Sequence, residues 1–306
     1  MTDTKELLAR LLHGGPFVRS DAPYSLLCVA GRDAADFLQR LCSQDVKSLA
    51  ESTTVPAAFL DAKGKVVATC LLQRVRQGEE DVFWIDTQAA QRDRLAQLLE
   101  RYHFTEKLVI STTGPGEPVC EEWIGAAGAT LPVRHGAVAF AWARGDVQFV
   151  RRHAKRGEAL PPWNGAVLDA DRADCLQMAA GIVSVGVDTE ATTLALEAFL
   201  DDHCSTTKGC YTGQEIVARI HTYGHTNRAL CLLELSAGPR IAAPVVLHEC
   251  EDDLPVGRVM RAVPQPGSEL RLGLGYLPKD YQQQGTKLQL AGGGDAVVVR
   301  AFVAAE

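Results

Sequence analysis

The chain lacks the features that define several specialised classes of protein. Its 306 residues include nine cysteines, an odd number without a CxxC pair, which disfavours a disulfide framework and a zinc ribbon. No apolar run approaches the roughly 20 residues that cross a bilayer, and residues 1–14 have neither a signal-peptide core nor the acid-free character of a transit peptide. We therefore expect a cytoplasmic protein with no membrane association and with mostly reduced, core-forming cysteines.

An excess of positive charge is also missing. The chain has 31 Lys and Arg residues against 38 Asp and Glu residues, which gives a formal net charge of −7. A surface of this sign repels phosphate backbones and anionic lipid headgroups, so we exclude a nucleic-acid coat protein and do not expect direct RNA contact. The apolar fraction of 46% and the charged fraction of 23% are typical of a folded globular protein.

Helical and strand-like periods alternate irregularly in the first 150 residues. Apolar spacing predicts helices over residues 5–12, 33–41 and 88–102. It predicts strands over residues 24–30, 55–60, 66–75, 81–86, 107–111, 136–142 and 146–150. Asp61-Ala-Lys-Gly64 lies between two of these strands and indicates a β-hairpin turn. The order is mixed α and β without the regular alternation of a doubly wound fold.

The pattern changes after about residue 227. Short strand-like runs follow one another at near-regular spacing, with Gly, Pro and Asp between them, at residues 228–236, 245–248, 255–263, 269–277, 287–290 and 296–303. This predicts two domains, a body over residues 1–227 and a small all-β barrel or sandwich over residues 228–306.

The most informative segment is Lys-Gly-Cys-Tyr-Thr-Gly-Gln-Glu-Ile-Val-Ala-Arg at residues 208–219. Thr212 and Glu215 form a capping-box pattern that predicts a helix starting at Gly213, and Glu215 precedes Arg219 at the spacing of a helical ion pair. Capping does not account for Lys208 or Cys210.

Cys210 is the best candidate for a reactive thiol. The positive end of the predicted helix and the ammonium of Lys208 would both stabilise its thiolate. The alternative is that Cys210 packs into the core while Lys208 points to solvent.

Residues 208–219 resemble the signature of the YgfZ family of folate-binding proteins, which is related to the glycine-cleavage aminomethyltransferase (T-protein) and includes mitochondrial iron–sulfur assembly factors. Further stretches resemble the family in the right order and extend the resemblance over nearly the whole chain. They are residues 29–39 with Gln44-Asp45, 59–66, and 254–259 followed by 272–276.

The resemblance implies an α+β fold, in which two intertwined N-terminal α/β parts of the aminomethyltransferase type carry a C-terminal all-β barrel. It implies tetrahydrofolate or a derivative as cofactor. It also implies iron–sulfur proteins as clients, and in bacteria these clients include iron–sulfur enzymes that thiolate tRNA. Lys208 and Cys210 would line the folate site and are the candidate catalytic residues. Further side chains of the types that bind the pterin and the glutamyl tail are Tyr211, Gln214, Glu215 and Arg219.

One departure from the related enzymes bears on activity. The aminomethyltransferases carry an Asp-Asp pair after the hairpin glycine, whereas this chain has no acid between Asp61 and Glu79. Glycine-cleavage activity is therefore disfavoured. Residues 196–204, which lead into the 208–219 segment, resemble the family only loosely.

Two further clusters carry less weight. His221 and His225 have metal-ligand spacing, but Gly224 should end the helix between them, so we expect no metal site. The basic run at residues 151–156 is interpreted as a solvated face, with RNA or a folate polyglutamate tail as the alternative ligand.

Three hypotheses follow for function. The first is a tetrahydrofolate-binding accessory protein for iron–sulfur cluster assembly or repair, with an effect on tRNA modification by iron–sulfur enzymes. The second is a folate-dependent one-carbon transferase or demethylase in which Cys210 or Lys208 is the nucleophile or base. The third is a scaffold that keeps the fold and binds no folate.

Overall fold

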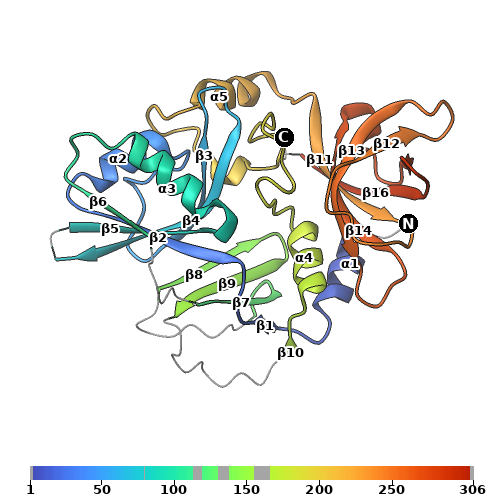
Figure 1. Cartoon of the computed structure of the whole chain (residues 1–306), viewed down its shortest axis with the longest axis horizontal. Coiled ribbons are helices and arrows are strands. Elements are labelled where there is room, and N and C mark those ends of the chain that lie inside the picture. The colour runs from blue at the N-terminus through green and yellow to red at the C-terminus, as the bar shows by residue number, and fades with distance from the viewer. Residues whose placement is uncertain (1–2, 79, 113–118, 130–137, 155–165, 304–306) are drawn as a thin grey trace. The chain divides into compact units, whose positions relative to one another are not determined.

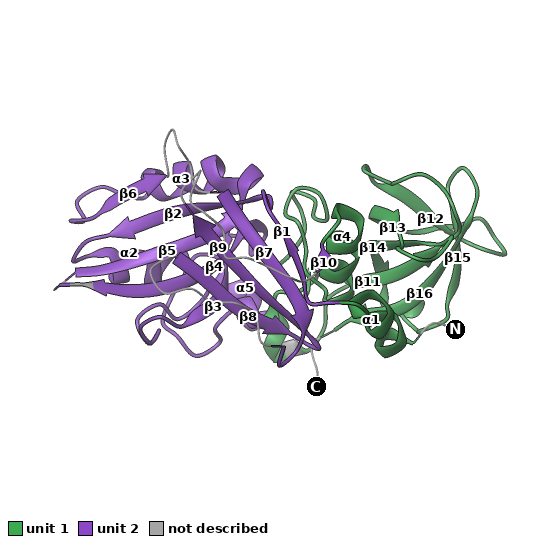
Figure 2. Cartoon of the chain, turned by 90° about the horizontal axis from the view of Figure 1, so that it is seen from below, with its two compact units in different colours: residues 1–14, 168–201, 220–306 green, residues 15–167, 202–219 purple. Residues whose placement is uncertain are grey.

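The computed structural model describes residues 3–78, 80–112, 119–129, 138–154 and 166–303. The chain forms two compact units, and each of them is assembled from separate stretches of sequence (Figure 2). Unit 1 consists of residues 1–14, 168–201 and 220–306, and unit 2 of residues 15–167 and 202–219. The first barrel strand begins at Arg228, and the division of the chain into domains at that point stays a prediction.

Unit 2 contains a five-stranded antiparallel sheet covered on one face by two helices (Figure 1). Its strand order is β3 (Thr54–Leu60), β4 (Val66–Gln77), β5 (Glu80–Gln88), β2 (Tyr24–Ala30) and β6 (Val109–Thr112). The helices are α2 (Ala34–Leu41) and α3 (Arg92–Arg101), the latter preceded by the short 3-10 helix η1 (Ala89–Gln91). Phe37 and Leu95 from the helices and Phe59 and Phe83 from the sheet are fully buried together. These elements confirm the expected ones to within a few residues.

A second sheet of unit 2 was only half predicted. Its order is β10 (Ala166–Val167), β1 (Phe17–Arg19), β7 (Val119–Ala126), β9 (Val147–Ala154) and β8 (Val138–Arg144). Only β10 and β1 pair in parallel. The sequence indicated β8 and β9, whereas β1, β7 and β10 were missed. Leu26 and Leu71 of the first sheet share a buried cluster with Phe140 of the second, so the two sheets pack against each other.

The basic run at residues 151–156 is not the solvated face that we expected. Arg151 and His153 are at most 5% exposed, and both contact Asp86 of the first sheet, at 2.9 Å and 2.7 Å. Arg151 also pairs with Glu122 at 3.0 Å, while Arg152 pairs with Glu121. Buried charges require such partners, because isolation from water is otherwise too costly. Residues 155 and 156 lie outside the described residues.

Unit 1 is built around a closed antiparallel barrel, which confirms the predicted all-β C-terminal part. The barrel order is β11 (Arg228–Leu235), β14 (Arg271–Pro278), β13 (Pro255–Pro264), β12 (Val245–Glu249), β15 (Lys287–Leu290) and β16 (Asp295–Phe302). Gly257 allows β13 to approach β14 closely, since a Cβ there would lie 2.5 Å from the carbonyl oxygen of Tyr276. The 3-10 helix η3 (Lys279–Tyr281) follows β14.

Two helices from earlier in the chain complete unit 1. They are α1 (Thr4–Leu12), which was predicted, and α4 (Ala170–Ala179), which was missed. They contact each other, and α4 also contacts β13 and β14. Across the described residues, none of the helices has the length and apolar character needed to span a membrane.

Candidate functional site

The segment at residues 208–219 forms a turn followed by the first part of α5 (Gln214–Tyr223). The helix starts one residue later than the capping-box pattern predicted, because Gly213 has a φ of +84°, which is not helical. The amide of Val217 nevertheless donates to the carbonyl of Gly213 at 3.5 Å. Gly213 is therefore the residue at which the chain enters the helix.

Two glycines lock this turn against the predicted β-hairpin. A Cβ on Gly213 would lie 2.6 Å from the carbonyl oxygen of Asp61, and a Cβ on Gly64 would lie 2.8 Å from the Cβ of Ile216. Gly64 also has a positive φ, of +72°. The Asp61 carboxylate closes the hairpin turn by accepting hydrogen bonds from the amides of Lys63 and Lys65. The stretches at residues 59–66 and 208–219, which are far apart in the sequence, thus pack against each other in one local structure.

Lys208 connects the stretch at residues 29–39 and Gln44-Asp45, which also resembles the family, to the turn before α5. Its ammonium donates to the carbonyl oxygens of Gln39, Cys42 and Gln44 at 2.8, 2.7 and 2.7 Å. These three bonds use all three ammonium protons. The side chain is 7% exposed, and burial lowers the pKa of Lys208. Lys208 holds the end of α2 and the residues that follow it against the turn.

The remaining predicted site residues divide between the interior and the surface. Tyr211 is buried, with its ring centroid 4.9 Å from the Lys208 ammonium, and its hydroxyl has no hydrogen-bond partner among the described residues. Burial raises the pKa of Tyr211. Gln214 is half-buried, and its side-chain amide lies 3.5 Å from the carbonyl oxygen of Lys208. The structure therefore brings Lys208, Tyr211 and Gln214 together.

Three predicted residues lie on the surface instead. Cys210 is exposed, so the alternative in which this thiol packs into the core is excluded. Glu215 and Arg219 are also exposed, and the ion pair expected between them is absent from the described part of unit 2. An exposed ion pair of this kind would contribute little to stability, so its absence costs the fold little. The side chains of Glu215 and Arg219 can therefore contact other molecules.

A polar cluster lies next to this turn. The Asp202 carboxylate accepts from His203 Nδ1 at 2.7 Å and from Arg144 at 3.0 Å. Burial alone would raise the pKa of Asp202, but the histidine and the arginine outweigh it and lower the pKa. The Ser43 hydroxyl donates to the carbonyl of His203 at 2.6 Å. Adjacent Asp and His residues gave a weak signal, whereas Ser43 and Arg144 gave none.

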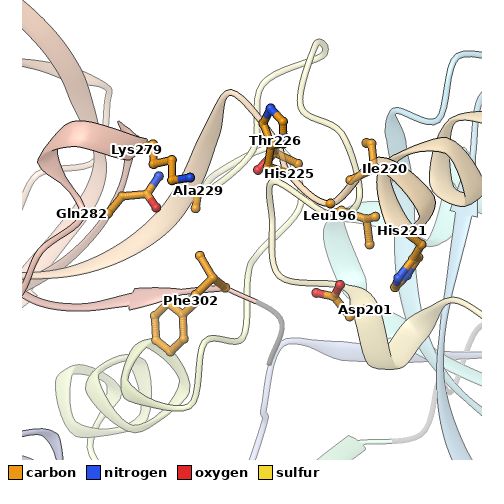
Figure 3. Close-up of a pocket in the computed structure, with 12 residues that line it drawn as sticks. Leu196, Asp201, Ile220, His221, His225, Thr226, Ala229, Lys279, Gln282 and Phe302 are labelled. Carbon is orange, nitrogen blue, oxygen red and sulfur yellow. The ribbon is translucent and has the colours of Figure 1, made fainter. Parts of the chain in front are cut away.

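Unit 1 contains a cavity of about 730 Å³ (Figure 3). Its apolar walls include Leu196 and Phe302, and its polar lining includes Asp201, Lys279 and Gln282. Phe302 packs on Phe199 with ring centroids 5.2 Å apart. The lining residues come from positions more than a hundred apart, so no local motif indicated the cavity.

The backbone beside this cavity is under strain. Phe199 has a φ of +57°, a region that non-glycine residues rarely occupy. A Cβ on Gly181 would lie 2.9 Å from both phenyl rings. Such strain persists only where the surrounding packing fixes it, so the wall formed by Phe302 is held in place.

The histidine pair that we judged unsuited to a metal is split as expected. Gly224 has a φ of +92° and follows the end of α5, so His225 lies beyond the helix. The structure places another potential ligand set in unit 2, in which Asp86, Cys120 and His153 have ligand atoms within 4.8 Å of one another. Asp86 is already paired with Arg151 and His153 there.

Comparison with known proteins identifies the fold. No family model matches the chain. Among solved structures, the crystal structure of glycine cleavage system aminomethyltransferase T from Bartonella henselae superposes with a TM-score of 0.72 at 18% sequence identity. The match covers 96% of this chain and 88% of that chain. The predicted fold class is thereby confirmed, and the chain has the fold of glycine cleavage system aminomethyltransferase T.

Proposed function

We propose that this protein is a tetrahydrofolate-binding accessory protein that supports the assembly or repair of iron–sulfur proteins, and through them tRNA modification. Folate binding rests on one observation, the chemistry of the unit 1 cavity in a chain with the aminomethyltransferase fold. The absence of an acid between Asp61 and Glu79 argues against glycine-cleavage activity.

The cavity residues fit the chemical parts of a reduced folate. A pterin needs an apolar slot for its ring and acceptors for its N–H groups, and the glutamyl tail needs a cation. Phe302 and Leu196 would cover the ring, Asp201 and Gln282 would accept from its donors, and Lys279 would pair with the tail (Figure 3). The volume is in the range of small-molecule sites. Lys279 is exposed and has no ion pair within the described residues.

The 208–219 segment contributes differently in this proposal. Lys208 has no free ammonium proton, so it is a positioning residue for the end of α2 and the residues that follow it, up to Gln44. Cys210 presents an exposed thiol just before α5, where a client protein can reach it. The same exposed thiol is the observation that favours the second candidate function, a folate-dependent one-carbon transferase or demethylase with Cys210 as nucleophile.

The cysteines support a reducing compartment. All nine are free thiols, and six of them are buried. Free buried thiols are typical of proteins in the cytoplasm, which is the location we propose.

Calorimetric titration with tetrahydrofolate and 5-formyltetrahydrofolate tests folate binding. We expect micromolar binding by the wild type and about tenfold weaker binding by Lys279→Ala, the loss of one charge-assisted contact. Lys287→Ala, an exposed lysine of β15, is the matched control. If the folded protein gives no heat with either folate, both folate hypotheses are rejected and only the scaffold hypothesis remains.

Two further measurements separate the accessory role from catalysis. In cells that lack the protein, we expect wild type to restore the activity of an iron–sulfur enzyme and Cys210→Ala to restore less. The purified Cys210→Ala variant should bind folate as the wild type does. Product formation from a folate one-carbon donor that disappears in Cys210→Ala would instead establish the transferase.

A further inference from the structure

Unit 2 carries an open groove between α3 and the hairpin turn at residues 61–64, with a volume of about 430 Å³. We call it the α3 groove. Its floor is aliphatic and is formed by Leu41, Leu60, Val67 and Leu98. Its rim includes Arg94, Arg101 and Tyr102, which are all exposed. Tyr102 is 43% exposed and adds an aromatic side chain to the rim beside the aliphatic floor.

The rim is positively charged and lacks internal counterions. Among the described residues, neither Arg94 nor Arg101 has an ion pair or a side-chain hydrogen bond. The acids of the helix are engaged elsewhere, Asp93 with Arg92 and Glu100 with His103.

The one acid that lines the groove, Asp61, forms no ion pair with either arginine among the described residues. The Asp61 carboxylate accepts from two amides of its own turn. An unpaired cationic rim on a chain of net charge −7 is a local feature that calls for an anionic partner.

The spacing of the two arginines restricts the shape of that partner. Arg94 and Arg101 are seven residues apart on one face of α3, which corresponds to a rise of about 10.5 Å, and Leu98 lies between them. In an extended peptide, side chains at positions i, i+2 and i+4 point the same way and span about 13 Å. Flexible arginine and glutamate side chains bridge the difference between the two lengths.

We propose that the α3 groove docks an extended acidic segment of a partner protein, with an apolar side chain midway between two carboxylates. The apolar residue would insert onto the aliphatic floor, and the carboxylates would pair with Arg94 and Arg101. The aliphatic floor favours a peptide with an apolar side chain over a nucleic acid, whose backbone offers only phosphates and sugars.

The groove would bring such a partner close to the exposed thiol. Thr212 lines the groove and lies two residues from Cys210. The Thr212 amide donates to the carbonyl of Arg40 at 3.2 Å, so the turn is anchored there. Docking at this groove is independent of folate binding, and a docked client would lie beside the turn that carries Cys210.

Fluorescence anisotropy with a labelled peptide, Gly-Glu-Ser-Leu-Ser-Glu-Gly, tests the proposal on the full chain without folate. We expect binding that weakens by about tenfold or more in the double variant Arg94→Glu/Arg101→Glu, because two attractions become repulsions. The double variant Arg32→Glu/Arg76→Glu changes the net charge equally at exposed positions outside the groove and should bind within about twofold of wild type. Circular dichroism melts establish that both variants are folded.

Three results would overturn the docking proposal, and none of them bears on the calorimetry with folates. The wild type fails to bind the peptide at about 1 mM, the Arg94→Glu/Arg101→Glu variant binds it as wild type does, or the neutral peptide Gly-Gln-Ser-Leu-Ser-Gln-Gly binds equally well. A single-stranded RNA oligonucleotide that binds more tightly than the acidic peptide, and loses binding in the same variant, would assign the groove to nucleic acid instead.

Discussion

Replacement of Lys208 by methionine should destabilise unit 2 rather than only weaken a ligand. Methionine keeps the aliphatic stem but removes three hydrogen bonds from a charged donor to backbone carbonyl oxygens, of which that of Cys42 is buried and the other two are half-buried. Hydrogen bonds to charged groups contribute about 1.5–3 kcal/mol each, but burial already disfavours the ammonium, as its lowered pKa indicates. We therefore expect a loss of about 3 kcal/mol, the lower end of the range for breaking a buried charged network.

Urea unfolding followed by tryptophan fluorescence measures this loss. The four tryptophans, at positions 84, 123, 142 and 163, all belong to the unit 2 sequence, so the signal reports on that unit. With a slope of about 2 kcal/mol per molar urea, the midpoint should fall by about 1.5 M. Lys63→Met, at an exposed lysine of the hairpin turn, should leave the midpoint unchanged. A Lys208→Met midpoint within about 0.3 M of wild type would refute this structural role. Lys208 would then again be a candidate for direct contact with a ligand.

Further predictions concern the turn, the thiols and alkaline pH. Gly213→Ala should cost about 2–3 kcal/mol from its positive φ and the clash with the hairpin, whereas Gly209→Ala, with open space around it, should be neutral in the same assay. Burial raises the pKa of Cys231 from 9.0 to about 12, so its share of stability is complete below pH 9 and is lost between pH 9 and 12. At pH 10 this amounts to about 1.4 kcal/mol, and Cys231→Ala should flatten that part of the pH profile of the melting temperature. Iodoacetamide should label Cys210 and Cys250 in the native protein before the other thiols, and mass spectrometry that finds a buried thiol labelled first would contradict the assignment.

Local patterns predicted the barrel and the first sheet well. Each barrel strand is a short run rich in apolar residues that ends at turn residues, so neighbouring residues carry the information. Strand β7 was missed because Glu121 and Glu122 made it look polar. Those acids are buried, and the arginines that neutralise them lie about 30 positions later. A pattern within one segment cannot reveal such a partner.

The candidate site shows the same limit. The residue types at positions 208–219 indicated that Lys208 and Cys210 are unusual, but the partners of Lys208 are backbone carbonyls, which every residue has. The unit 1 cavity depends on Asp201, Lys279 and Phe302, which only the fold brings together. The exposure of Cys210 was left open by the sequence and is decided by the structure.

The interleaving of the two units has a consequence during synthesis on the ribosome. Unit 2 needs residues 202–219 in addition to residues 15–167, so the carbonyl oxygens of Gln39, Cys42 and Gln44 have no lysine to bind until the later segment exists. At about 5–20 residues per second, the interval between residues 167 and 219 lasts about 3–10 s. During that time the two sheets of unit 2 lack the turn that joins α2 to the hairpin, so unit 2 cannot reach its final packing.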